Sequence, residues 1–207
     1  SRRGVVLGGV IAGVSTALGV SAVKAGSVSA NMGSDAADAA NDAEILNKAL
    51  YYEHQAIWAY GAAAGALSDT EVGRLVKALA LKNQADHMVH RDTLVEVISS
   101  LGGTPVMAES SYDVSSYIEN GEGGLDSDVN IAKLALALET DAAIAYASEV
   151  AGLKTPALIT AGAGIGATEA SHATAIRAVF ISLGVEMPLV PAAFVTADTR
   201  DAWILKV

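Results

Sequence analysis

The feature that most constrains the fold of this chain is an internal repeat. Residues 53–60 read Glu-His-Gln-Ala-Ile-Trp-Ala-Tyr, and residues 139–146 read Glu-Thr-Asp-Ala-Ala-Ile-Ala-Tyr. A glutamate, two alanines and a tyrosine therefore recur at offsets of 0, 3, 6 and 7. Such matched spacing indicates that one structural unit occurs twice in the chain.

A second match follows each of these segments. The spacing from His90 to Gly102 is the same as the spacing from His172 to Gly184. Both glycines follow a Ser-Leu pair, as expected where a helix ends. Because the match extends over two successive segments, the repeated unit is predicted to be a pair of helices.

The spacing of apolar residues, together with end signals, predicts four helices. Ser68 and Glu71 form a capping box that places the cap of the second helix at Ser68, and Pro156 suits the first turn of the fourth. Residues 104–126 contain Pro, Gly, Ser and Asn and are predicted to form a crossover. The expected helices cover residues 35–67, 69–101, 127–153 and 156–184.

The lengths of the three links favour one fold class. The links between the first and second helices and between the third and fourth are short, and the link between the second and third is long. This order predicts an all-α, antiparallel four-helix bundle in which a long crossover joins two hairpins. We assign residues 35–184 to this bundle and residues 185–207 to a tail that packs on the bundle or on a partner. The chain has no cysteine, which excludes disulfides and thiolate metal sites.

The glutamates and histidines of the repeat resemble the metal ligands of the ferritin-like superfamily, which includes ferritins and rubrerythrins. In that family one helix of each hairpin gives a Glu and the other gives Glu-x-x-His. The resemblance covers residues 35–184 and implies a ferritin-like bundle with a dinuclear site. It implies that Glu53 and His90 hold one metal, that Glu139 and His172 hold the other, and that Glu169 bridges them.

The second helix departs from the family pattern. The residue three before His90 is His87, where the family has a second bridging glutamate. An alternative register, Gln84-Ala-Asp-His87, also lacks the glutamate. The implied ligand set is then three carboxylates and three histidines, which suits Fe, Mn or Zn at a dinuclear or a mononuclear site. The alternative is a relic site, in which the histidines neutralise the buried glutamates by ion pairing.

The two repeated tyrosines lie two helical turns beyond the repeated glutamates. Tyr60 and Tyr146 could donate hydrogen bonds to the site or act in radical or electron transfer, but we interpret them as core residues with one end in water. His54 is adjacent to Glu53 and therefore about 100° round the helix. We leave His54 out of the site.

Residues 1–34 are predicted to be a leader and linker. Arg2 and Arg3 precede an uncharged run over residues 4–23, which resembles a twin-arginine export signal and is long enough to cross a bilayer as a helix. Val28-Ser29-Ala30 is a plausible cleavage site, so a removed signal peptide remains open. We favour a membrane anchor, whose Gly-x-x-x-Gly spacings would let another helix pack closely, with the body in the periplasm or at the cell surface.

The charge distribution bears on possible partners. The formal net charge is −10, and residues 1–30 contain three basic residues and no acid, so the remainder carries about −13. An acidic body repels phosphate backbones, which argues against nucleic acid as a partner. We expect a homo-oligomer or a larger membrane or extracellular assembly.

Two functions remain open from the sequence. One is an exported, membrane-tethered metalloprotein with oxidoreductase-type chemistry on iron, peroxide or oxygen. The other is a non-catalytic accessory subunit with a relic metal site. The missing glutamate of the second helix and the apolar residues of the tail favour the second.

Overall fold

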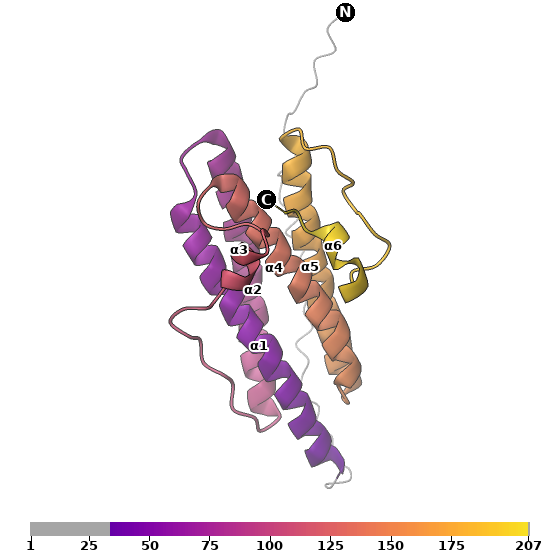
Figure 1. The fold of residues 1–207 in the computed structure, drawn as a ribbon. Coiled ribbons are helices and arrows are strands. Elements are labelled where there is room, and N and C mark those ends of the chain that lie inside the picture. The colour runs from indigo at the N-terminus through magenta and orange to yellow at the C-terminus, as the bar shows by residue number, and fades with distance from the viewer. Residues whose placement is uncertain (1–33, 207) are drawn as a thin grey trace, which may run out of the picture. The chain divides into compact units, whose positions relative to one another are not determined.

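A computed structural model describes residues 34–206, all of whose regular elements are helices. The predicted leader and its hydrophobic helix lie outside these residues. Four long helices and two short ones follow along the chain (Figure 1), with single 3₁₀ turns at Val150–Gly152 and Ala197–Thr199. The α-helices are α1 (Ser34–Ala66), α2 (Glu71–Ser100), α3 (Ser115–Glu119), α4 (Asp128–Glu149), α5 (Pro156–Ser182) and α6 (Arg200–Trp203).

The four long helices form two packed pairs, α1 with α2 and α4 with α5, as Figure 1 shows. The all-helical prediction is confirmed for the described residues. The crossover contains the short helix α3, which the sequence analysis had not predicted. Within residues 34–206, no helix is both long and apolar enough to span a bilayer.

Local sequence explains where the helices begin and end. Thr70 caps α2 by accepting a hydrogen bond from the Gly73 backbone N–H, so the predicted cap at Ser68 was wrong by two residues. The Ser68 hydroxyl does not cap α2, because it donates a hydrogen bond to Asp128 at the start of α4. Pro156 occupies the first turn of α5, as predicted.

The repeated glycines follow the ends of α2 and α5. Gly102 has a φ of 81° and Gly184 a φ of 91°, a left-handed conformation that other residues adopt only with strain. Both glycines lie two residues beyond the last helical residue, so the repeat has a direct structural counterpart.

Two apolar clusters fill the bundle, one towards each end. The first contains Leu46 and Leu50 of α1 with Leu94 and Ile98 of α2. The second contains Ile131 and Leu136 of α4 with Ala173, Ile176 and Phe180 of α5 and Ala63 of α1. Along every long helix, the repeated glutamates and histidines lie between the positions that enter the two clusters. The bundle therefore holds the predicted ligands at mid-height.

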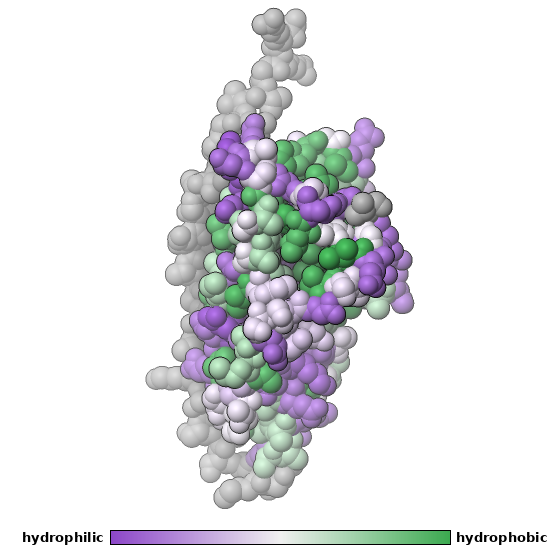
Figure 2. All heavy atoms as spheres, turned by 60° about the vertical axis from the view of Figure 1, so that its left-hand side comes forward, coloured by the Kyte–Doolittle hydropathy of each residue, from purple (hydrophilic) through white to green (hydrophobic). Residues whose placement is uncertain are grey.

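The tail is held to the bundle by two arginines. Arg177 of α5 is 2% exposed and donates hydrogen bonds to the backbone carbonyls of Pro188, Leu189 and Trp203. Arg200 of α6 pairs with the carboxylates of Glu122 in the crossover and Asp141 of α4. On the face drawn in Figure 2, the most hydrophobic residues gather mainly in the upper half, with hydrophilic residues around them.

Candidate metal centre

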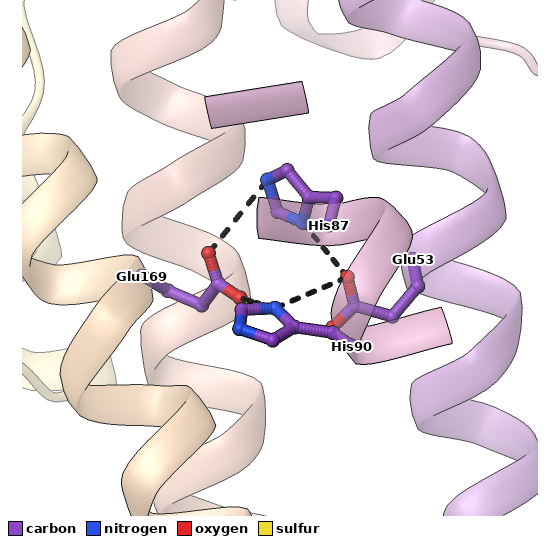
Figure 3. Close-up of side chains that lie close together, drawn as sticks. All are labelled: Glu53, His87, His90 and Glu169. Carbon is purple, nitrogen blue, oxygen red and sulfur yellow. Dashed lines mark hydrogen bonds and ion pairs between the residues drawn. The ribbon is translucent and has the colours of Figure 1, made fainter. Parts of the chain in front are cut away.

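All six residues predicted as ligands lie together at the middle of the bundle. Glu53 comes from α1, Glu139 from α4, and the remaining four come from α2 and α5. The glutamates and His87 are at most 2% exposed, and even the most exposed of the six, His90, keeps only 12% of its side chain accessible. Figure 3 shows four of them pointing towards one another from three helices.

The six side chains divide into two groups, each of which could hold a metal ion. Within each group, one ligand atom per residue lies within 4.8 Å of all the others. The two groups share His87 and Glu169, which are the residues that the family resemblance places between two metals. The groups are Glu53, His87, His90 and Glu169, and His87, Glu139, Glu169 and His172.

His87 connects the two halves of the centre. Its Nδ1 lies 2.7 Å from Glu53 Oε2, and its Nε2 lies 3.2 Å from Glu139 Oε1. Both partners are acceptors, so both ring nitrogens donate only when the ring is protonated. Burial alone would lower the pKa of His87, but the hydrogen bonds to Glu139 and Glu53 raise it to about 11.

The other two histidines are in similar surroundings. His172 Nδ1 lies 3.1 Å from Glu169 Oε2 and 3.3 Å from Glu139 Oε2. Burial opposes protonation, but the neighbouring carboxylates raise the pKa of His172 to about 10 and that of His90 to about 9. Without a metal, protonated histidines therefore lie against the carboxylates of Glu53 and Glu139 and offset their negative charge.

The pKa values of Glu53 and Glu139 shift in the opposite direction, downwards. Burial would raise the pKa of Glu53, but the hydrogen bonds and positive charge of His87 and His90 lower it. Burial likewise acts against the charged form of Glu139, and His172 and His87 lower its pKa well below the usual range. Both carboxylates are thus ionised at neutral pH, the form in which they bind cations.

One position in the network is incompletely satisfied. His90 Nδ1 and Glu169 Oε1 are buried and lie 3.0 Å apart, but their orientation does not make a hydrogen bond. Buried polar atoms without partners are costly, and a shared cation would satisfy both. The oxygen and nitrogen donors also suit Fe, Mn or Zn. The residues present therefore fit a metal ion.

The repeated tyrosines bind the glutamates across the two helix pairs. The Tyr60 hydroxyl of α1 donates to Glu139 of α4, and the Tyr146 hydroxyl of α4 donates to Glu53 of α1. Both tyrosines are buried core residues, as predicted, but their hydroxyls bind glutamates, so the prediction of one end in water was wrong. Burial and the adjacent carboxylates raise the pKa of each phenol well above its usual value, which keeps both protonated.

Two further residues of the site were missed by the sequence analysis. Asn83 is 2% exposed and donates to the Tyr60 hydroxyl. Asp86 lies 3.3 Å from His172 Nε2, the ring nitrogen that faces away from the glutamates. Asn83 stands one helical turn before His87, a spacing that could have indicated a shared face. His54 contacts the Val106 carbonyl outside the centre.

The fold and this centre define a class of protein, an all-helical bundle with a buried Glu/His group able to hold a metal ion. The model of the ferritin-like domain matches residues 41–182 of the chain. The chain therefore belongs to the ferritin-like domain family.

Among solved structures, the chain is similar to a conserved hypothetical protein from Mycobacterium tuberculosis, with 25% identity and a TM-score of 0.54. That similarity covers 76% of this chain and 99% of the other. No curated protein matches the sequence.

Proposed function

We propose that this protein binds one or two transition-metal ions, Fe or Mn before Zn, and carries out oxidoreductase-type chemistry with peroxide or oxygen. The observation that carries the proposal is the convergence of the six Glu and His residues in two overlapping groups. Glu53 and His90 would hold one ion, Glu139 and His172 the other, and Glu169 would be shared.

When bound, a redox-active metal supplies the electrons that such chemistry requires. The residues of the chain contribute the surroundings. The ionised carboxylates of Glu53 and Glu139 offset the charge of the cation, and the two apolar clusters keep bulk water from both ends of the centre. Tyr60 and Tyr146 hold protons at their hydroxyl oxygens and orient the glutamates of the opposite helix pair. Asp86 orients the ring of His172.

Metal analysis of the chain purified without added metal tests this proposal. We expect one or two Fe or Mn ions per chain, and at least a tenfold loss in Glu169→Gln, which keeps the shape of the side chain. Glu96→Gln is the matched control, because Glu96 is exposed on α2. A metal-free chain, or equal metal content in both variants, would contradict metal binding at this centre.

A second candidate is a non-catalytic accessory subunit with a relic site. The observation that favours it is the direct contact of His87, His90 and His172 with the buried glutamates, which stabilises the centre without a cation. This candidate predicts a folded, metal-free protein as purified. It also predicts that added Mn²⁺ raises the melting temperature of the wild type no more than that of Glu169→Gln.

Export and membrane attachment are a separate part of the proposal, and the sequence of residues 1–30 supports them. We propose that Arg2 and Arg3 direct export of the folded chain, that residues 4–23 anchor it, and that it works outside the cytoplasm as an oligomer or within a larger assembly. Replacing both arginines by lysine should leave the protein in the cytoplasm. Release of the intact chain from membranes by salt alone would contradict the anchor.

A further inference from the structure

A cavity of about 230 Å³ lies between α1 and α4, beside the Glu/His centre. Its walls come mainly from small and aliphatic side chains. The alanines of the repeat lie on these walls, at the third and sixth positions after each repeated glutamate. They are Ala56 and Ala59 of α1 and Ala142 and Ala145 of α4.

The repeat thus carries a feature that metal binding does not explain. If these alanines served only to bring two helices close together, their interface would be filled, because protein interiors are packed as densely as organic crystals. Here the four alanines face a space that stays open. Larger aliphatic residues, Leu134 and Leu138 among them, close its sides.

The inner end of the cavity reaches the centre. Tyr60, His87 and Glu139 form this end, and all three are at most 6% exposed. Their polar groups are engaged with one another, so the inner end offers no unpaired cation to an anionic molecule. A carboxylate entering the cavity would therefore lose its hydration without gaining a cation in return.

The outer end is open to solvent. Tyr52 is 42% exposed there, as is Leu125 of the crossover. Tyr117 of α3 and Asp141 of α4 also line the cavity, and Arg200 of the tail holds this region together by pairing with Asp141 and with Glu122 of the crossover. The tail therefore positions the part of the crossover that covers the cavity.

We propose that this cavity binds a neutral molecule the size of a substituted benzene ring, which then lies against Glu139 and Tyr60. An apolar cavity of about 150 Å³ stays dry and takes up benzene, so this larger space accommodates a ring with a small substituent. The tyrosine rings of the lining suit an aromatic partner. The inference deepens the proposed function by naming the class of molecule that approaches the centre, but the binding itself requires no metal.

Fluorine NMR on the full chain, treated with a chelator, tests the inference with 4-fluorotoluene as the probe. We expect saturable binding to the wild type, and at least tenfold weaker binding to Ala142→Leu, because leucine fills the cavity. Ala147→Leu makes the same substitution at an exposed position further along α4 and should bind as the wild type does. Ala59→Leu repeats the test from α1.

A charged probe of similar size tests whether the cavity favours neutral molecules. The anion 4-fluorobenzoate should bind at least tenfold more weakly than 4-fluorotoluene, and equal binding would overturn the assignment to neutral molecules. Contacts between the bound ring and the alanine methyl groups, measured by the nuclear Overhauser effect in the wild type, locate the probe even if a leucine variant fails to fold.

The inference is overturned if the wild type shows no saturable binding, or if both cavity-filling variants fold and bind as the wild type does. Metal analysis remains a separate measurement. If the chain binds metal but not 4-fluorotoluene, only this inference is contradicted. If it binds 4-fluorotoluene but no metal, only the proposed function is contradicted.

Discussion

At the scale of single residues, His87 determines the charge of the centre. It stands where the family pattern has a bridging glutamate, and it contacts glutamates of both halves. A glutamate at this position would supply a fourth carboxylate and remove one positive ring. That exchange should favour two bound cations over one, because each added carboxylate offsets part of the repulsion between the ions.

We therefore expect His87→Glu to raise the metal content towards two ions per chain and to lower the stability of the metal-free protein, in which four carboxylates would share two histidines. Metal analysis and thermal unfolding with and without a chelator would measure both effects. His54→Glu, outside the centre, is the control. Unchanged metal content in His87→Glu would argue against the proposed role of this position.

The Tyr60 hydroxyl has two partners, because it donates to Glu139 and accepts from Asn83. Tyr60→Phe leaves both partners buried and short of one hydrogen bond. We expect the free energy of unfolding to fall by about 1–3 kcal/mol. Urea denaturation would measure it, with Tyr51→Phe on the exposed side of α1 as the control. If the free energy of unfolding falls no more than in Tyr51→Phe, water replaces the missing hydroxyl as the hydrogen-bond partner.

At the scale of elements, the repeat also includes an aspartate near the start of α1 and of α4. Asp42 precedes Glu53 at the same spacing as Asp128 precedes Glu139. The Asp128 carboxylate accepts from the Ser68 backbone N–H in the α1–α2 link, and the Asp42 carboxylate accepts from the Lys154 backbone N–H ahead of α5. Each helix pair thus uses an aspartate to hold the turn of the other pair.

Asp42 is the more buried of the two aspartates, with no exposed surface. It also accepts from the Thr155 backbone N–H, at the start of a helix whose cap residue makes no side-chain hydrogen bond. Asp42→Ala should lower the free energy of unfolding by about 1–3 kcal/mol, because two donors lose a charged acceptor. Asp38→Ala, exposed one turn earlier on α1, is the control for thermal or urea unfolding. Equal stability of the two variants would contradict this role.

At the scale of the whole molecule, the repeat made the helices and the convergence of the six site residues predictable. The spacing of Glu53 and Glu139 relative to the apolar residues shows that they lie on the buried face of their helices. A side chain on the buried face points into the bundle, so the pattern was enough to predict that these residues meet there. The hydrogen bonds of Asn83 and Asp86 were not predictable in this way, because they depend on distances between helices. The cavity was not predictable for the same reason, because alanines occur both at closely packed helix interfaces and along open cavities.

The balance of charge in the centre links stability, pH and metal binding. The pKa values of His87, His172 and His90 are raised from 6.5 to about 11, 10 and 9. A raised pKa contributes stability that is fully present below pH 6.5 and is lost as the pH rises through the folded value. The lowered pKa values of Glu53 and Glu139 act the other way, and their contribution is lost as the pH falls below about 4.5.

The metal-free protein should therefore be most stable near pH 5–6.5. Above that range its free energy of unfolding should fall by about 1 kcal/mol per pH unit or more, because the folded chain keeps protons that the unfolded chain has released. Metal ions bind neutral histidine and displace these protons, so saturating Mn²⁺ should remove most of the fall between pH 7 and 9. Urea denaturation across this range, with a chelator and with Mn²⁺, would measure the difference. A flat profile in the chelated protein would mean that the three rings are neutral and that the glutamates are balanced in another way.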